Sequence, residues 1–362
     1  MAGIIDLKLT DPRSESASWD QLFNLSRSSM LRWTVVIVPF CQFMESMMQV
    51  FSEADDRPHR PDGDPLWQES SLFVWHDAVA GVGGFWRLGQ EPVLGALNSC
   101  FGIFTADGLR FRSNVTGVPM NDGDRGEAHM GWGSHLRVLF DGAAQIDADF
   151  PDCEACLQFF DFHPRFDYHS IAMPGATLSG AAHHFEVSGR MTGNIRIDGR
   201  EFAINALGYR DRSWARRDWS TSRGTRWWPC VFGPDLTTHI IHLVQDGHVL
   251  KVGYVWRDGE TIPIIDSDVI VELESDALTP RAGRGRLHLA NGEILSVECD
   301  RSDAIMMHVR GYTAIECIGT ARMGSRAGMS NLEVSSNAGG GYSLPLCTIG
   351  SNASQGLSRR PD

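Results

Sequence analysis

Short apolar segments, separated by tight turns, follow one another through most of the chain. Such segments are expected on both sides of four turn dipeptides: Asp107-Gly108, Asp198-Gly199, Asp246-Gly247 and Asn291-Gly292. These dipeptides tolerate the positive φ angles of a two-residue hairpin turn. Repeated strand–turn–strand units without helices between them predict antiparallel sheets, which must close or pack together to hide their edges. The chain is therefore predicted to be all-β, and the number of expected strands suits two tandem barrels better than one.

An N-terminal extension precedes the predicted barrels. A helix is expected from Ser18, because the sequence SWDQLFNL combines a helix N-cap with apolar residues at helical spacing. A polar linker that contains prolines follows it. The predicted limits are 1–63 for the helical extension and linker, 64–219 for the first barrel, 220–350 for the second barrel and 351–362 for a polar, disordered tail.

The composition narrows the classes of function. The chain of 362 residues is long enough for two β domains. Its net charge of −13 argues against binding to nucleic acid, which requires a basic surface to displace counterions from the phosphates. The eight cysteines are scattered, with one C-x-x-C pair at Cys153 and Cys156, so we expect reduced thiols and a cytoplasmic location.

The first 50 residues predict neither a signal peptide nor a membrane span. Asp6 and Lys8 interrupt the segment where the apolar part of a signal peptide would begin. The most apolar segment, 30–44, is shorter than the roughly 20 residues that cross a bilayer, and it contains Arg32 and Pro39. We expect it to form a docking or homodimer contact, without stable membrane insertion.

Tyr209 and Asp211 are the first candidates for chemistry. They are two residues apart at the expected end of a strand and therefore share one face. Aromatic walls would desolvate Asp211 and raise its pKa, so that it could act as a general acid. Nearby arginines would instead hold it ionised, as a structural carboxylate paired with Arg210 or Arg216. The pattern alone favours the structural alternative.

His184 and Glu186 form a second candidate pair, because they alternate with Phe185 and Val187. If the face that carries His184 and Glu186 looks into a barrel, two titratable groups line a cavity and can provide acid/base catalysis. The alternative is a solvated outer face above an apolar core, and the alternation by itself favours that alternative.

Three further residues are candidates for contacts with a substrate. His163 and Tyr168 lie in a dense run of ionisable and aromatic side chains, 161–169, which could border the mouth of a pocket. Its histidines and aspartates could also bind a metal ion, but their alternation favours internal pairing over a metal site. Trp228, beside Trp227, is expected to contribute to packing or, as the less favoured alternative, to form a platform for a substrate.

Several motifs resemble those of a known family. The segments 186–189 (EVSG) and 208–214 (GYRDRSW) are similar to motifs of the carotenoid 1,2-hydratase (hydroxyneurosporene synthase)/AttH-like superfamily. The blocks 67–70, 83–87 and 108–111 look like the first half of its uncharacterised bacterial branch, and 316–333 looks like the second half. The resemblance therefore covers residues 64 to 333, without the N-terminal extension.

The resemblance implies two lipocalin-like barrels with a hydrophobic pocket, and neither a metal nor an organic cofactor. Activities in this superfamily include the addition of water to an isolated alkene and, in related fungal proteins, the steering of pericyclic cyclisations. The catalytic Tyr-x-Asp arrangement of the hydratase matches Tyr209 and Asp211. By that match, Asp211 would transfer a proton to or from the substrate, Tyr209 would orient it, and Trp214 would wall the pocket. Arg212 and Ala215 depart from the family pattern, because many relatives carry His and Gly there.

We therefore predict a cofactor-independent lyase, a hydratase or dehydratase that acts on a hydrophobic terpenoid, steroid-like or aryl-propanoid small molecule. One alternative is a protein that only binds such a ligand by burial, and another is a cyclase or isomerase that only shapes its substrate. A cavity around Asp211 would favour the enzyme, whereas a bidentate arginine pair would favour the binding protein. The predicted catalytic residues are Asp211, Tyr209, Glu186 and His184, and the predicted substrate contacts are Trp214, Arg210, Trp228, His163 and Tyr168.

Overall fold

The computed structural model describes residues 51–171, 181–221, 223–245, 248–275, 279–337 and 355–360. The expected N-terminal helix and the apolar segment 30–44 lie outside these residues, so the homodimer contact stays a prediction. None of the helices within the described residues is long and apolar enough to cross a membrane.

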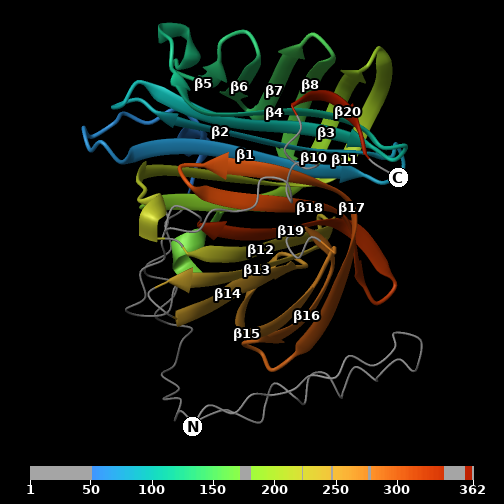
Figure 1. Cartoon of the computed structure of the whole chain (residues 1–362). Coiled ribbons are helices and arrows are strands. Elements are labelled where there is room, and N and C mark those ends of the chain that lie inside the picture. The colour runs from blue at the N-terminus through green and yellow to red at the C-terminus, as the bar shows by residue number, and fades with distance from the viewer. Residues whose placement is uncertain are drawn as a thin grey trace, which may run out of the picture. The chain divides into compact units, whose positions relative to one another are not determined.

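Two antiparallel sheets make up the described structure (Figure 1). The first is a curled half-barrel of twelve strands in the order β20-β4-β3-β2-β1-β11-β10-β8-β7-β6-β5, with β9 paired to β10. The second is a closed barrel of eight strands, β12 to β19, in sequence order. The all-β prediction is confirmed, with the curled sheet in the first half of the chain and the closed barrel in the second.

The element bounds follow the turn signals of the sequence. The strands of the half-barrel are β1 (Trp67–Asp77), β2 (Val82–Glu91), β3 (Ala96–Thr105), β4 (Leu109–Pro119), β5 (His129–Trp132), β6 (Leu136–Asp141), β7 (Ala143–Phe150), β8 (Cys153–Asp161), β9 (Phe166–Asp167), β10 (His183–Ile197), β11 (Arg200–Arg216) and β20 (Gly356–Arg359). The strands of the barrel are β12 (Gly224–Gly233), β13 (Leu236–Gln245), β14 (His248–Arg257), β15 (Glu260–Leu273), β16 (Pro280–Leu289), β17 (Ile294–Val309), β18 (Tyr312–Met323) and β19 (Arg326–Asn337). The short 3-10 helices of the described residues are η1 (Glu53–Asp56), η2 (Asp122–Asp124), η3 (Tyr168–Ile171) and η4 (Trp219–Thr221).

Three of the four turn dipeptides join neighbouring strands, whereas Asp246-Gly247 lies outside the described residues. Asp198 and Gly199 join β10 to β11 with φ angles of 50° and 71°. Gly108, between β3 and β4, has a φ angle of 86°. These three φ angles belong to the left-handed region that tight hairpin turns use.

The C-terminal tail differs from the prediction of disorder for 351–362. Gly356–Arg359 forms strand β20, which pairs with β4, and Leu357 packs against the core of the half-barrel. Strand β4 would otherwise end the sheet with unpaired backbone groups, and the added strand covers them. The polar composition of the tail hid this pairing, because an edge strand needs few apolar residues.

Side-chain alternation places one core inside the barrel and another between the sheets. Trp228 points into the barrel with residues of all its strands, whereas Trp227 points outward. There Trp227 packs against Tyr209 of the half-barrel, in a cluster that also contains Phe85. Figure 1 shows the barrel below the half-barrel, with β1 in contact with β18 and β19. The space between the outer wall of the barrel and one face of the half-barrel contains the candidate site.

Candidate functional site

One row of side chains crosses the half-barrel on the face that looks toward the barrel. Asp211 lies directly opposite Glu186 on β10 and Leu72 on β1. Leu72 in turn lies opposite Arg87 on β2. Directly opposite residues of an antiparallel pair share a face, and Leu72 packs into the core between the sheets. Glu186, Asp211 and Arg87 therefore all point toward the barrel.

A buried network surrounds the carboxylate of Glu186, which is inaccessible to solvent. The Tyr209 hydroxyl donates a hydrogen bond to Oε2 at 2.9 Å, and Nε1 of Trp227 donates one to Oε1 at 2.8 Å. Nδ1 of His239 lies 2.9 Å from Oε2, and the hydroxyl of Tyr254 lies 2.7 Å from that of Tyr209. Since Trp227, His239 and Tyr254 belong to the barrel, the network joins the two sheets.

These neighbours set the protonation states of the network. Burial alone would raise the pKa of Glu186, but the charge of His239 and the hydrogen bonds to the carboxylate outweigh burial and lower it. Burial, and then the negative charge of Glu186, raises the pKa of Tyr209 well above its usual value. Glu186 is therefore an anion at neutral pH, and Tyr209 stays a neutral hydrogen-bond donor.

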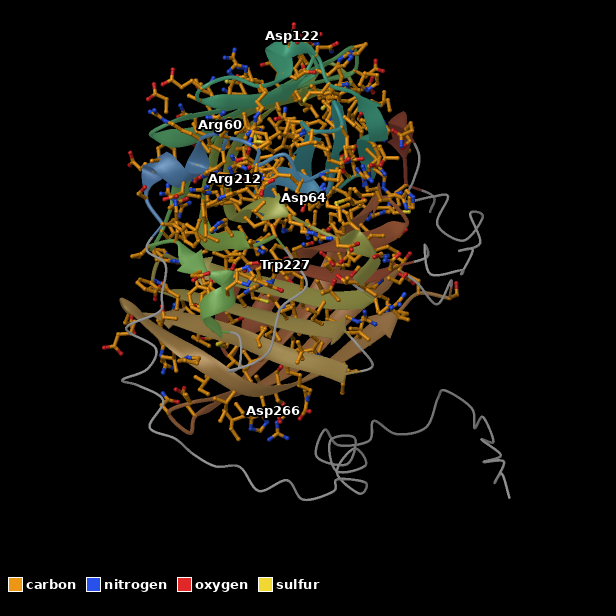
Figure 2. The ribbon with its side chains drawn as sticks, turned by 90° about the vertical axis from the view of Figure 1, so that its left-hand side faces the viewer. Arg60, Asp64, Asp122, Arg212, Trp227 and Asp266 are labelled. Carbon is orange, nitrogen blue, oxygen red and sulfur yellow. The ribbon has the colours of Figure 1, made fainter. Side chains whose placement is uncertain are left out.

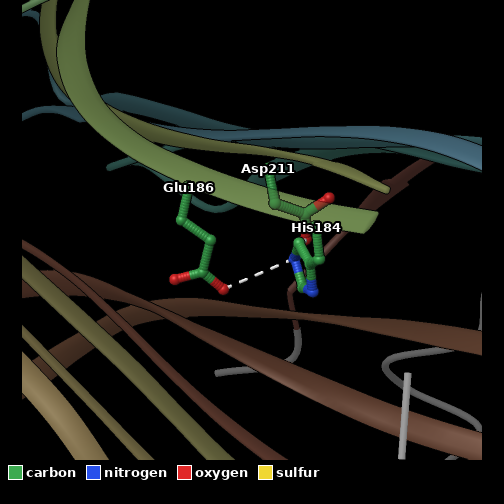
Figure 3. A group of neighbouring side chains, drawn as sticks. All are labelled: His184, Glu186 and Asp211. Atoms are coloured by element: carbon green, nitrogen blue, oxygen red, sulfur yellow. Dashed lines mark ion pairs between the residues drawn. The ribbon is translucent and has the colours of Figure 1, made fainter. Parts of the chain in front are cut away.

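His184 connects this network to Asp211 (Figure 3). Its Nε2 atom lies 3.6 Å from Oε1 of Glu186 and 3.7 Å from Oδ2 of Asp211. The ring of Tyr168 stacks on the ring of His184 with 4.4 Å between the centroids. The side chain of Asp211 is 15% exposed, so it retains access to water while it faces the barrel.

The alternatives that the sequence pattern favoured do not hold. His184 and Glu186 are buried between the two sheets and do not form a solvated outer face. Arg210 and Arg216, the expected partners of Asp211, bind other carboxylates. Arg210 pairs with Asp56 and Asp161, and Arg216 pairs with Asp64 and Asp218.

A small cavity of about 80 Å³ lies between the sheets at this point. Its walls combine apolar and charged residues: Leu72, Arg87, Tyr168, His184, Asp211, Arg217, Asp218, Trp219, Thr225, Trp227, Ile241, Leu243, Met307, Tyr312 and Glu333. A larger pocket of about 410 Å³ shares the wall that Arg217, Asp218 and Trp219 form. The two spaces are therefore neighbours.

A second pair of carboxyl groups lies on the barrel side. Glu316 on β18 and Glu333 on β19 are direct cross-strand partners, and both are buried. Oε1 of Glu333 accepts hydrogen bonds from the hydroxyls of Tyr312 at 2.9 Å and Thr225 at 3.0 Å. Burial raises the pKa of both carboxyls, and the charge of Glu333 raises that of Glu316 further. Two adjacent buried carboxyls do not both ionise readily, so Glu333 can be present in its neutral form.

Four predicted substrate contacts lie away from the cavity. Arg210 and Trp214 project from the opposite face of β11, because side chains alternate along a strand. Trp214 packs there against Phe51. Arg212 lies on the same face of β11, and Figure 2 shows it above Trp227 of the barrel. The other two have separate roles: Trp228 donates to Ser330 Oγ inside the barrel, and His163 stacks on Trp256.

The sequence analysis missed the groups that the barrel supplies. His239, Tyr254 and Glu333 come from strands far along the chain from Tyr209. One signal was present, because the two apolar segments on either side of Asp246-Gly247 were expected to pair, and in β13 and β14 His239 lies directly opposite Tyr254. The sequence gives no comparable signal for Glu333 or Arg87, since their neighbours depend on how the two sheets pack.

His184, Glu186 and Asp211 each offer a ligand atom, and these atoms lie within 4.8 Å of one another. This is the group among the described residues that could hold a metal ion, and the run 161–169 contributes none. Both oxygens of Glu186 already accept hydrogen bonds from Tyr209 and Trp227. The arrangement therefore fits a hydrogen-bonded acid/base group better than a metal site.

Comparisons with known proteins agree with this architecture. Residues 52–338 match a family model described as a domain of unknown function, DUF7064. No curated protein is significantly similar in sequence. A structure of a putative AttH from Nitrosomonas europaea matches with a TM-score of 0.58 and 12% identity, over 78% of this chain and 96% of that chain.

Two further solved structures share the fold. CghA matches with a TM-score of 0.54 and 12% identity, over 80% of this chain and 96% of that chain. Kievitone hydratase from Nectria haematococca matches with a TM-score of 0.54 and 8% identity, over 81% of this chain and 94% of that chain. At this identity the likeness shows the fold alone. The chain thus belongs to the DUF7064 family and shares its fold with these three solved structures.

Proposed function

We propose that the protein is a hydro-lyase that adds water to a carbon–carbon double bond of a hydrophobic small molecule, or removes it. The observation that carries this proposal is the pair of Asp211 and Glu333, which line one cavity from the half-barrel and from the barrel. Their surroundings differ, because Asp211 lies beside His184 whereas burial holds the pKa of Glu333 above its usual value. Two carboxyls with such different environments suit the roles of base and acid.

In the hydration direction, neutral Glu333 donates its proton to one carbon of the double bond. The positive charge on the other carbon develops beside the ring of Trp227, whose face attracts a cation. A water molecule bonds to that carbon while Asp211, with His184 beside it, accepts the proton that water releases. The product has gained one water, and the proton on Asp211 returns to Glu333 through water in the adjoining pocket.

The hydrogen-bond network of Glu186 positions the groups that take part in this proposed chemistry. Oε1 of Glu186 lies 3.6 Å from Nε2 of His184 and helps to hold the imidazole beside Asp211. Tyr209 and Trp227 fix the Glu186 carboxylate by hydrogen bonds to its two oxygens. In this proposal Tyr209 is a positioning residue, because its hydroxyl is committed to Glu186 and Tyr254.

The substrate is a terpenoid, steroid-like or aryl-propanoid compound in this proposal, and the reaction needs no cofactor. Sites for small molecules commonly measure about 300–1,000 Å³. The cavity of about 80 Å³ can therefore hold only the reacting end. The rest of the molecule lies in the pocket of about 410 Å³ beyond Trp219.

The test is turnover in ¹⁸O-labelled water without added cofactor, with prenylated aromatics, acyclic terpenes and aryl-propanoids as the panel. We expect a product that carries the label, and a loss of rate of about 10²–10⁴-fold in Asp211→Asn and in Glu333→Gln. Asp149→Asn and Glu298→Gln, at exposed positions, are the matched controls. Unchanged turnover in Asp211→Asn would favour a cyclase or isomerase that only shapes its substrate, and binding without turnover would favour a binding protein.

A further inference from the structure

Arg87 is a buried cation on the wall of the cavity. It is 3% exposed, and its Nη2 atom lies 3.4 Å from Oε1 of Gln68. Gly89 makes space for the guanidinium, since a Cβ atom there would lie 2.9 Å from Nη1 of Arg87. In the part of the chain that the structure describes, no carboxylate oxygen lies within 4.0 Å of this guanidinium. A buried charge without a partner of opposite sign is costly.

A second arginine approaches the same place. Cζ of Arg217 lies 4.0 Å from the ring centroid of Trp219, and Cζ of Arg87 lies 5.4 Å from that centroid. The hydrogen bond of the Arg217 guanidinium goes to Ser213 Oγ at 3.4 Å, a neutral acceptor. Burial, and then repulsion by Arg217, lowers the pKa of Arg87 to about 10. Two guanidiniums thus share one aromatic ring without an anion between them.

The acidic groups around this arginine pair are engaged elsewhere. Glu91 pairs with Arg310, and Asp211 lies beside His184. Glu333 accepts hydrogen bonds from Tyr312 and Thr225. The charges of Asp211 and Glu91 favour protonated Arg87, but they act from beyond ion-pair distance. An anion that entered the cavity would therefore meet two guanidiniums that no carboxylate neutralises directly.

We propose that Arg87 and Arg217 form a subsite for a carboxylate group of the substrate, so that the substrate is a hydrophobic acid. A guanidinium presents paired N–H donors that match the two oxygens of a carboxylate. Both guanidiniums line the same cavity as Asp211 and Glu333. The inference rests on the proposed function in one respect, namely that the same cavity holds the reacting carbons.

The register of the sheet sets the distance between the two ends of such a substrate. Arg87 on β2 and Asp211 on β11 lie opposite the same residue, Leu72 on β1, and are therefore two strands apart. Neighbouring strands are about 4.8 Å apart. The carboxylate of the substrate is then expected within roughly 10 Å of the reacting double bond, as in a short unsaturated acid.

The test measures binding to the full chain by calorimetric titration, with two pairs of probes that differ in charge. Cinnamate is compared with cinnamyl alcohol, and geranate with geraniol. We expect at least one acid to bind at least tenfold more tightly than its alcohol, and this preference to vanish in Arg87→Gln and in Arg217→Gln. Arg322→Gln, at an exposed barrel position, is the control and keeps the preference.

Three results would overturn the subsite. They are equal affinity for acid and alcohol in the unmodified protein, no measurable binding of either acid, and a preference that survives both arginine substitutions. Phenyl phosphate forms a further arm of the titration, because a phosphate offers similar chemistry. Tighter binding of phenyl phosphate than of both acids would replace the carboxylate assignment by a phosphate subsite.

Two measurements separate this inference from misfolding and from the proposed function. Arg87→Met is expected to unfold at the same denaturant concentration as the unmodified protein or a higher one, because it removes a buried charge without an ion-pair partner. A lower midpoint would show that Arg87 is structural. The acid preference is also expected in Asp211→Asn, so it can persist where turnover fails. Turnover of neutral alkenes without any acid preference would retain the proposed function and reject the subsite.

Discussion

The two faces of strand β11 carry similar residue types but engage them differently. On the face away from the barrel, Arg210 binds Asp56 and Asp161, and Arg212 binds Glu69 at 2.7 Å. These are closed ion pairs, with every guanidinium directly opposed by carboxylates. They join β11 to the segment around η1 and to β1 and β8.

On the face toward the barrel the charges are not closed in this way. Oδ2 of Asp211 lies 3.7 Å from Nε2 of His184, and the side chain of Asp211 is 15% exposed. The hydrogen-bond partner of Arg87 is the neutral side chain of Gln68. Ionisable groups whose partners are incomplete can still change their protonation state or bind a ligand. In the arginine-rich GYRDRSW segment, Arg210 and Arg212 therefore form structural ion pairs, whereas Tyr209 and Asp211 face the proposed site.

The largest effect on stability is expected from breaking the closed pairs. Arg212→Met leaves Glu69 buried and opposed only by His59 and Arg125. Removing one partner of a buried ion pair costs about 3–5 kcal/mol of unfolding free energy. Asp211→Asn is expected to change it by less than about 0.5 kcal/mol, since no close ion pair is lost. Equal losses in the two variants, measured by urea denaturation, would contradict the distinction between the faces.

The next largest effect is expected from acid, because protonation of Glu69 weakens the ion pairs on the face away from the barrel. Burial alone would raise the pKa of Glu69, but Arg212, His59 and Arg125 together lower it to about 2. The folded-state pKa is depressed, so its stabilisation is present above pH 4.5 and is lost as pH falls toward 2. The loss amounts to about 3 kcal/mol. Glu69→Gln should flatten this part of the curve of unfolding free energy against pH, and an unchanged curve would argue against the assignment.

A smaller effect of opposite sign is expected from Glu316 on strand β18 of the barrel. Burial, and then Glu333, raises the pKa of Glu316 well above its usual value. Its contribution to stability is therefore full below pH 4.5 and is lost as pH rises through the raised pKa. Glu316→Gln should stabilise the protein at pH 8, because the amide carries no charge that burial would penalise. The gain should shrink as the pH approaches 4.5, and destabilisation at pH 8 would contradict this account.

The smallest effect is expected from chelation. Turnover should be unchanged after dialysis against EDTA, because both oxygens of Glu186 already accept hydrogen bonds and a metal would have to displace Tyr209 or Trp227. Loss of activity that zinc restores would instead assign a metal to His184, Glu186 and Asp211.

Local patterns predicted the hairpins and the shared face of Tyr209 and Asp211, because strand alternation and turn chemistry act over a few residues. They could not predict which face of β10 is buried, since that depends on a barrel built from residues after 223. The expectation that Arg210 and Trp214 contact substrate followed from proximity in sequence to Asp211. Alternation along the strand puts both on the opposite face.

The central claim is that neutral Glu333 supplies a proton in the cavity. The most direct test is the pH dependence of kcat/KM, compared between Glu333→Gln and Glu316→Gln. The substrate is one whose turnover the experiment in ¹⁸O-labelled water has identified. We predict that Glu333→Gln loses at least about a hundredfold at every pH. Glu316→Gln should stay active, with its decline at rising pH close to that of the unmodified protein, because burial raises the pKa of Glu333, whereas the charge of Glu333 acts on Glu316. Full activity of Glu333→Gln, or a rate that rises as Glu333 ionises, would contradict the account.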